Sequence, residues 1–384
     1  MDCWMSDLTP ALAWDLACGG PFPDPNELSG DERFMAVALK EARAGVGLSS
    51  PNPPVGCLLV KDGRVIGQGV HTRAGDPHGE IVALTSAEAR YEKVSGATAY
   101  VTLEPCCHHG RTPPCTSALI LAGVARVVVG VRDPNPRVDG GGFSTLRAAG
   151  VEVVEGILGE ACSRFHAPFF KLIRTGLPFV SLKLALGSDG SASRMGETTP
   201  LTPPSIQGLA HALRRASDAI LVGRGTVAQD DPQLTDRWPA ATPAHRRFIR
   251  VVLDSQGKLG PERQVWHPYP GQPALRVLTR EALPLRAVED LHVPPALDGS
   301  GCSLRHLLHE LASRGVGRVL LEGGPRLAEA FLAAGLVDEA HLFRSTQPTG
   351  GSPVKLHGVN DWRLRAQIPW TAEGKSGIWE IFEP

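Results

Sequence analysis

The side chains from His78 to Cys115 constrain the fold of this chain more than any other feature. His78-Gly79-Glu80 is followed by Pro105-Cys106 and then by Cys115. A catalytic zinc ion takes three protein ligands of the His and Cys type and leaves its fourth position open for water. A strand-like run over 98–103 leads into the first thiol, and a helical pattern over 116–120 follows the second. Both thiols therefore lie where a strand ends and a helix begins, which is typical of active sites in α/β folds.

The same residues indicate a class of chemistry. Zinc lowers the pKa of a bound water from about 15.7 to about 7, and a Glu that does not bind the metal can carry the proton to a leaving amine. The pattern H-x-E…P-C-x-x-C is the signature of zinc deaminases, and here the second thiolate is displaced, as P-C-x8-C. We therefore expect His78, Cys106 and Cys115 to bind zinc and Glu80 to carry the proton.

Three alternatives to a catalytic zinc site in a small-molecule deaminase are weaker. Taken singly, each His or Cys is more often a packing residue, because free Cys is among the most buried residue types. A structural zinc module would need a fourth ligand, with Cys107, His108 or His109 as candidates, and would leave Glu80 without a role. A nucleic-acid deaminase is disfavoured because no basic stretch is interleaved with aromatic residues on which a single strand would stack.

Length, charge and cysteine content limit the number of domains, the kinds of partner and the cellular compartment. The chain has 384 residues, enough for two domains with full cores, and a formal charge of −1, which gives no overall attraction to nucleic acid or membranes. No apolar run approaches the ~18 residues of a membrane span. Residues 1–30 lack the features of a secretion signal and are expected to be a poorly ordered extension. Eight scattered cysteines favour a reducing cytoplasm over a disulfide framework.

Helix and strand patterns predict an α/β domain over residues 31–175 and a second over 176–384. In the first, helices are expected over 31–45, 79–90, 116–120 and 142–149, and strands over 55–60, 64–70, 98–103, 126–131 and 151–155. Asp62-Gly63 between the first two strands predicts a β-hairpin. In the second, strands are expected over 179–184, 219–222, 250–253, 275–278 and 318–321, and helices over 205–216, 303–313 and 325–334. Such alternation implies sheets covered by helices.

Further residues of the first domain occur in the order of a known family. They are Pro51-Asn52-Pro53-Pro54-Val55-Gly56, Ala74 to Glu80, Thr102 to Cys115 and Asp133-Pro134-Asn135-Pro136. On these residues the domain resembles the deaminase domain of the bifunctional riboflavin-biosynthesis deaminase/reductases, in which the long insert between the thiolates is itself a feature. The resemblance implies a cytidine-deaminase-like three-layer α/β/α fold and hydrolytic deamination of 2,5-diamino-6-ribosylamino-4(3H)-pyrimidinone 5′-phosphate.

Six polar residues are candidates for substrate contacts in this domain. They are Asn52, His71, His108, Arg111, Asp133 and Asn135. The Asn52 amide can present a donor and an acceptor to a pyrimidine edge, and the Arg111 guanidinium suits a phosphate. The alternative for each is a loop residue that caps a turn, since Asp-Pro-Asn-Pro is mainly turn chemistry. Gly79 and Cys107 replace the family's usual Ala and Ser without removing a zinc ligand.

The second domain resembles the reductase domain of the same family. The resemblance implies a dihydrofolate-reductase-like α/β fold that uses NADPH to reduce the ribosyl chain to a ribityl chain. Cofactor contacts are expected from Lys183, Thr226, Asp230, Ser255, Gly323 and Gly324, and substrate contacts from Thr198, Leu234, Arg237 and Glu322. Independently, Gly-Gly followed by Pro325 at the start of a helix leaves backbone N–H groups suited to a phosphate.

Several reductase positions depart from the family pattern. Residues 187–191 replace Ser-Leu-Asp-Gly-Arg, Pro200-Leu201 replaces Trp-Ile, Gln207 replaces an Arg, and residues 345–350 replace Ala-Pro-Lys-Leu-Leu-Gly. Losing an Arg that pairs with a phosphate removes a contact worth ~1.5–3 kcal/mol, although Arg237 is present. Two versions stay open: both activities, or an active deaminase whose reductase domain is weak or silent and acts as a scaffold. A homo-oligomer through this domain is also expected.

Overall fold

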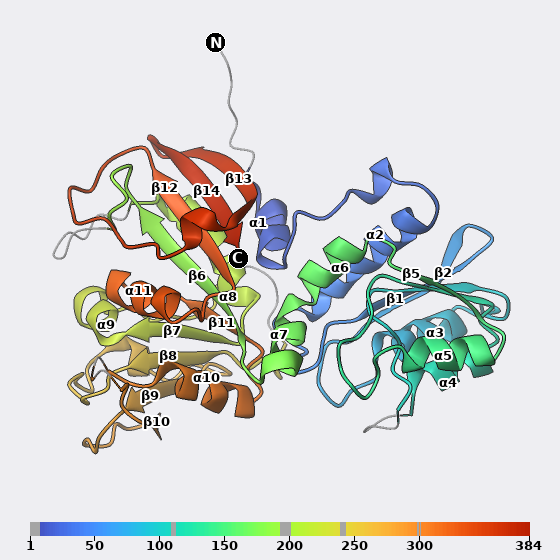
Figure 1. The fold of residues 1–384 in the computed structure, drawn as a ribbon, viewed down its shortest axis with the longest axis horizontal. Helices are drawn as coiled ribbons and strands as arrows, with labels where there is room; N and C mark the ends of the chain where they lie inside the picture. The colour runs from blue at the N-terminus through green and yellow to red at the C-terminus, as the bar shows by residue number, and fades with distance from the viewer. Residues whose placement is uncertain (1–7, 109–112, 193–200, 239–242, 298, 300) are drawn as a thin grey trace, which may run out of the picture. The chain divides into compact units, whose positions relative to one another are not determined.

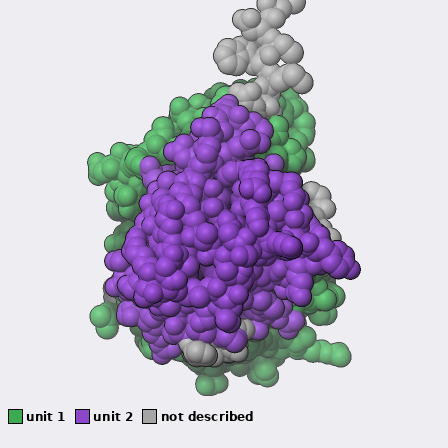
Figure 2. All heavy atoms as spheres, turned by 90° about the vertical axis from the view of Figure 1, so that its right-hand side faces the viewer, with its two compact units in different colours: residues 1–17, 177–384 green, residues 18–176 purple. Residues whose placement is uncertain are grey.

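The computed structural model describes residues 8–108, 113–192, 201–238, 243–297, 299 and 301–384. The chain divides into two compact units, which Figure 2 shows in different colours. Unit 1 comprises residues 1–17 and 177–384, and unit 2 comprises residues 18–176. None of the helices that the described residues form has both the length and the apolar character needed to cross a bilayer.

Unit 2 is built on a sheet whose described strands follow the order β2-β1-β3-β4-β5. The strands are β1 (Gly56–Lys61), β2 (Arg64–Val70), β3 (Thr98–Val101), β4 (Arg126–Val129) and β5 (Glu152–Glu155). Strand β1 is antiparallel to both β2 and β3, whereas β3, β4 and β5 run parallel. The helices are α2 (Gly30–Ala42), α3 (Gly79–Ala89), α4 (Cys115–Leu121), α5 (Gly141–Ala148), α6 (Gly159–Phe165) and α7 (Ala167–Thr175).

Glycines in the hairpin of β1 and β2 let helices approach the sheet closely. A Cβ atom added at Gly56 would lie 2.4 Å from the carbonyl oxygen of Ala38 in α2. One added at Gly67 would lie 2.4 Å from the carbonyl oxygen of Ala83 in α3. Helices α2 and α3 cover opposite faces of this sheet (Figure 1). This is the sandwich that the alternating sequence pattern predicts.

Unit 1 contains a larger mixed sheet, whose described strands follow the order β10-β9-β8-β7-β11-β6-β12-β14-β13. The strands are β6 (Phe179–Leu186), β7 (Ala219–Gly223), β8 (Ile249–Leu253), β9 (Ala274–Leu278), β10 (Val288–His292), β11 (Arg318–Leu321), β12 (Glu339–Ser345), β13 (Arg363–Ala372) and β14 (Lys375–Glu383). Neighbouring strands from β10 to β12 run parallel, and the terminal hairpin of β13 and β14 adds antiparallel strands. The helices are α1 (Pro10–Ala17), α8 (Pro204–Arg215), α9 (Arg224–Asp230), α10 (Leu304–Ser313) and α11 (Pro325–Ala333).

The predicted helices and strands are present within a few residues of their expected ends. The hairpin of β1 and β2 turns at Asp62-Gly63, where both residues have positive φ, as that turn requires. Elements that the sequence analysis did not predict include α1, α6, α7, α9, β10 and the three strands β12 to β14.

The expectation of a poorly ordered extension over residues 1–30 is wrong for residues 8–30. Helix α1 begins at Pro10, and its apolar residues Ala13, Leu16 and Ala17 are fully buried. The Phe22 ring meets the Phe165 ring edge to face, 5.9 Å between centroids. Apolar residues fill almost every position of α1, so the sequence shows no amphipathic period that would mark it.

Candidate functional site

The three expected zinc ligands converge in unit 2 from three separate segments. His78 is the N-cap residue of α3, Cys106 lies in the loop after β3, and Cys115 is the first residue of α4. The His78 Nδ1 atom lies 3.2 Å from the Cys115 Sγ and 3.6 Å from the Cys106 Sγ. All three ligand atoms lie within 4.8 Å of one another. Hydrogen bonds from Cys115 and His78 lower the pKa of Cys106, which favours the thiolate that a metal needs.

Glu80 lies in the first turn of α3, beside the ligand His78. Glu80 is only 2% exposed to solvent, and its Oε2 atom has no hydrogen-bond partner among the described residues. Burial, with a contribution from the charge of Cys106, raises the pKa of Glu80 to about 7. A carboxyl group with such a pKa can both accept and release a proton near neutral pH.

The donor set fits a catalytic zinc ion better than a structural one. One imidazole and two thiols form the cluster, and within the described ranges no fourth His, Cys, Asp or Glu joins it. Cys107 lies outside the cluster, with its Sγ atom 3.9 Å from the carbonyl oxygen of Arg137. His109 falls outside the described residues. Three protein ligands leave the fourth position for water, and Glu80 then has a role beside it.

Asn52 and His71 form a chain of hydrogen bonds that leads to the ligand His78. The Asn52 amide nitrogen lies 3.1 Å from His71 Nε2, and His71 Nδ1 lies 3.0 Å from the carbonyl oxygen of Pro77. Burial lowers the pKa of His71, so the ring is neutral, with Nδ1–H donating to Pro77 and Nε2 accepting from Asn52. The His71 ring also packs edge to face against His78, at 5.3 Å. His71 therefore contacts both Asn52 and the expected ligand His78.

Asp133 and Asn135 form turns beside the cluster. Asp133 Oδ1 accepts the N–H of Asn135 at 2.8 Å, and Asn135 Oδ1 accepts the N–H of Arg137 at 3.1 Å. These are the turn roles that the sequence analysis kept as the alternative. Burial raises the pKa of Asp133 to about 6, and the charge of Cys106 contributes to that rise. His108 is half-buried at the end of the described loop, and Arg111 lies outside the described residues.

Glu104 has a structural role that the sequence analysis missed. Its buried carboxylate accepts backbone N–H groups from Asp133 at 3.3 Å, Gly140 at 3.1 Å and Gly142 at 3.0 Å. It thereby ties the loop after β4 to the strand end that carries Cys106. The sequence signal for this role is the acidic residue placed directly before Pro105-Cys106.

Replacing Glu104 with Gln is expected to destabilise unit 2. An amide NH₂ would face backbone N–H groups, and losing one such charge-assisted hydrogen bond costs about 1.5–3 kcal/mol of unfolding free energy. Urea unfolding of the two proteins measures the change. The matched control is Glu88→Gln, at an exposed position of α3, which should leave the midpoint unchanged. Equal midpoints for Glu104→Gln and the unaltered chain would contradict the anchoring role.

The reductase candidates in unit 1 gather at the carboxyl ends of adjacent parallel strands. Gly323 and Gly324 lie between β11 and α11, and Glu322 donates its backbone N–H to the Leu221 carbonyl in β7. An added Cβ at Gly324 would lie 3.7 Å from Thr226 Oγ1, so α9 and α11 begin side by side. Asp230 ends α9, Ser255 follows β8, and Leu234 is buried in the loop after α9. Ligands of open α/β sheets bind at this edge.

A buried ion pair lies in this region. The Arg214 guanidinium, from α8, donates to both carboxylate oxygens of Glu322, at 2.9 and 2.8 Å. Burial opposes the charged carboxylate, but Arg214 and Lys183 together lower the pKa of Glu322 to about 2. Burial also lowers the pKa of Lys183, and Glu322 opposes that effect. The structure thus brings the candidates Lys183 and Glu322 together.

His211 and Arg214 were missed by the sequence analysis. His211 lies on α8, where burial and the charge of Arg214 lower its pKa to about 4, so the ring is neutral. Its Nε2 atom lies 3.4 Å from the Nη2 atom of the candidate Arg237 and accepts its N–H. Both residues fall in a predicted helix, where basic residues near the C-terminus ordinarily complement the helix dipole. No pattern in the sequence pairs them with distant partners.

Two segments that depart from the family pattern contact each other. The Asp189 carboxylate accepts the backbone N–H groups of Thr349 at 3.2 Å and Gly350 at 2.7 Å. It also accepts the Ser191 hydroxyl at 2.7 Å. Gln207, which replaces an Arg, donates to the Thr202 carbonyl at 2.8 Å. Thr198 and Pro200 lie outside the described residues.

Two families match successive parts of the chain. Residues 28–131 match the cytidine and deoxycytidylate deaminase zinc-binding region, and residues 178–366 match the RibD C-terminal domain. The zinc cluster therefore lies within a match to a zinc-binding family. The predicted fold class, a cytidine-deaminase-like domain followed by a dihydrofolate-reductase-like α/β domain, is confirmed.

Proteins of known identity match most of the chain. The riboflavin biosynthesis protein RibD of Escherichia coli is 42% identical over 327 residues, which are 82% of this chain and 87% of the relative. RibD of Aquifex aeolicus is 38% identical over 314 residues, covering 82% and 86%. A solved deaminase/reductase from Thermotoga maritima superposes with a TM-score of 0.80 at 34% identity, covering 92% of this chain and 99% of that one. RibD of Acinetobacter baumannii superposes with a TM-score of 0.76 at 32% identity, covering 92% and 99%.

Proposed function

The chain belongs to the family of bifunctional riboflavin-biosynthesis deaminase/reductases, and on that premise we propose which residues carry each of its two reactions. Unit 2 carries the deaminase, with His78, Cys106 and Cys115 as zinc ligands and Glu80 as the proton carrier. The observation that supports this assignment most is the convergence of three ligand atoms within 4.8 Å, beside a buried carboxyl group with a free oxygen. Unit 1 carries the reductase.

The deaminase substrate is 2,5-diamino-6-ribosylamino-4(3H)-pyrimidinone 5′-phosphate. Zinc, when bound, lowers the pKa of a coordinated water to about 7 and so supplies hydroxide at neutral pH. Glu80 takes up the proton of the attacking water and delivers it to the departing amino group, which leaves as ammonia. Asn52 binds the pyrimidine edge and is held in orientation by His71. Arg111, His108, Asp133 and Asn135 stay as predicted contacts to the base, ribose or phosphate.

The reductase acts on the deaminated product, 5-amino-6-(5-phosphoribosylamino)uracil, with NADPH. We assign cofactor contacts to Lys183 in β6, to Thr226 and Asp230 in α9, and to the loop residues Ser255, Gly323 and Gly324. We assign substrate contacts to Thr198, Leu234, Arg237 and Glu322, with Arg237 on the phosphate. Support comes from the clustering of Lys183, Glu322 and the His211-Arg237 pair around α8. NADPH, when bound, supplies a hydride, and the neutral His211 keeps Arg237 in place.

A coupled assay tests the two activities separately. The diaminopyrimidine phosphate is supplied with and without NADPH, and ammonia release and NADPH oxidation are followed together. Ammonia release that does not depend on NADPH, followed by NADPH oxidation, supports the proposal. Ammonia release without NADPH oxidation, while deaminated product accumulates, supports the alternative of a silent reductase domain.

Replacing Arg237 with Ala is expected to raise the KM of the reductase about ten- to a hundredfold. The change removes a charge-assisted contact worth about 1.5–3 kcal/mol, which is one to two decades in affinity. Initial rates of NADPH oxidation at varied deaminated substrate measure the change. The control Arg305→Ala, at an exposed position of α10, should behave like the unaltered chain. An unchanged KM for Arg237→Ala would remove this residue from the phosphate site.

We also propose a cytoplasmic location and a homo-oligomer formed through unit 1. Free thiols are typical of a reducing compartment, and the described residues Cys57, Cys106, Cys107, Cys115, Cys162 and Cys302 are free thiols. Light scattering on the purified full chain tests the oligomeric state. A mass equal to that of a monomer would contradict the proposed association.

A further inference from the structure

Helix α1, at the start of the chain, packs within unit 1 against α8. Helix α8 carries His211 and Arg214, two residues of the reductase region. In sequence α1 is separated from α8 by the whole of unit 2. Its inclusion in unit 1 therefore depends entirely on tertiary contacts.

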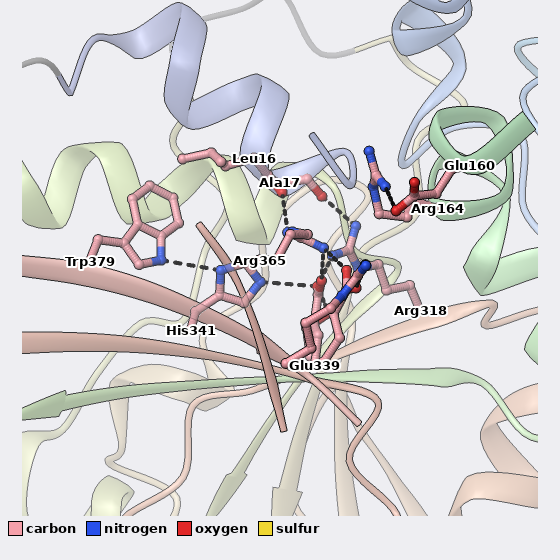
Figure 3. Close-up of polar contacts among 12 residues, drawn as sticks. Leu16, Ala17, Glu160, Arg164, Arg318, Glu339, His341, Arg365 and Trp379 are labelled. Carbon is pink, nitrogen blue, oxygen red and sulfur yellow. Dashed lines mark hydrogen bonds and ion pairs between the residues drawn. The ribbon is translucent and has the colours of Figure 1, made fainter. Parts of the chain in front are cut away.

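Two buried arginines hold the C-terminal end of α1. Arg365 Nη2 donates to the Leu16 carbonyl at 3.2 Å, and Arg318 Nη1 donates to the Ala17 carbonyl. Figure 3 shows both guanidinium groups directed at these carbonyls. The last carbonyls of a helix lack partners within the helix and carry a partial negative charge, so guanidinium donors satisfy them well.

A buried glutamate pairs with both arginines, and Glu383 pairs with Arg365 as well. The Glu339 carboxylate, whose residue is 2% exposed, pairs with Arg318 and with Arg365, the latter at 3.1 Å. Burial lowers the pKa of His341, so this ring is neutral, and its Nε2 atom lies 3.0 Å from the same carboxylate. Trp379 Nε1–H donates to His341 Nδ1 at 3.2 Å, which leaves the His341 proton on Nε2. The end of α1 is thus attached to a buried network of charged and polar side chains in the sheet.

Helix α1 also contacts the segment that carries Arg237. The Trp14 and Trp238 rings stack, with centroids 6.1 Å apart and planes inclined by 25°. Trp238 directly follows Arg237, and the backbone N–H of Trp238 donates to Asp236 Oδ1 at 3.0 Å. Helix α1 therefore contacts both supports of Arg237: helix α8, whose His211 accepts its N–H, and the aromatic residue beside it.

We propose that α1 is a positioning element of the reductase site, in which Trp14, stacked on Trp238, holds Arg237 in reach of the substrate phosphate. The inference rests on the reductase function proposed above and adds a residue far away in sequence. Trp14 itself touches no reacting atom. Its loss should weaken phosphate recognition without changing hydride transfer.

The test compares Trp14→Ala with Trp14→Phe in the full chain, because Phe retains an aromatic face for the stack. The Kd of 5-amino-6-(5-phosphoribosylamino)uracil is measured by calorimetry, and KM and kcat by NADPH oxidation. Aromatic pairs contribute about 0.5–1.5 kcal/mol, so Trp14→Ala should raise Kd and KM about two- to tenfold. Trp14→Phe should keep most of the affinity of the unaltered chain. The kcat and the rate of ammonia release should stay unchanged in both.

Repeating Trp14→Ala in an Arg237→Ala background separates positioning from general support. If Trp14 acts through Arg237, the second change adds little to the KM, since interacting residues are not additive. An unchanged Kd in Trp14→Ala, or fully additive effects in the double variant, would overturn the inference. If the unaltered chain binds the deaminated product but does not oxidise NADPH, the reductase proposal alone is contradicted. The Kd values of the Trp14 variants still decide the role of Trp14 in that case.

Discussion

Replacing Glu80 with Gln is expected to lower kcat for deamination about a thousandfold, within the range of about 10²–10⁴ that a positioned proton carrier contributes. The amide has the size of the carboxyl group but cannot carry a proton between the water and the leaving amine. Zinc should stay bound, because Glu80 is not one of the three residues whose ligand atoms converge. Ammonia release and metal content, measured on the same preparation, check both expectations.

Two further observations sharpen this prediction. Glu80 is buried, and one carboxylate oxygen has no partner among the described residues, so its carboxylate does little for the stability of unit 2. Glu80→Gln should therefore unfold at the same denaturant concentration as the unaltered chain, or higher. Glu88→Gln, at an exposed position of the same helix, serves as the matched control for activity. Full activity in a zinc-loaded Glu80→Gln chain would show that another group moves the proton.

Replacing Cys115 with Ser is expected to abolish deamination and zinc binding together. The hydroxyl group does not ionise near neutral pH as a thiol does, and the cluster offers no fourth ligand among the described residues to compensate. NADPH oxidation should persist when deaminated substrate is supplied, because the reductase residues belong to unit 1. Metal analysis and the two separate assays measure these outcomes.

Cys107→Ser is the matched control for the loss of Cys115. It removes a thiol next to the ligand Cys106 but outside the cluster, and it introduces the residue usual in the family. This variant should retain zinc and activity. Loss of zinc from Cys107→Ser would mean that Cys107 takes part in binding the metal.

Chelation should distinguish a catalytic from a structural metal in the unaltered chain. Unit 2 has its own buried apolar core, which includes Leu59, Val101, Val127 and Phe143, so it should remain folded when zinc is removed. Structural zinc modules, in contrast, unfold without metal. Circular dichroism before and after chelation measures the difference.

Local sequence patterns predicted much of the fold and the whole zinc set. The hairpin at Asp62-Gly63 and the strand-to-helix positions of Cys106 and Cys115 follow from turn chemistry and apolar spacing, which act within a few residues. The antiparallel strands β12 to β14 were not predicted. They are held by pairing with one another and with β6, and pairing partners are not visible in any single strand.

Residue types and their order along the chain by themselves determined the α/β class, the family resemblance and which three side chains meet in the His-Cys-Cys cluster. Tertiary structure alone decided which distant groups act together. Arg214 meets Glu322, Asp189 meets the backbone at 349–350, and α1 joins unit 1 across the whole of unit 2. The physical reason is that a metal site needs specific atoms, which the residue names reveal. A buried charge needs only some partner, and the fold decides which one it meets.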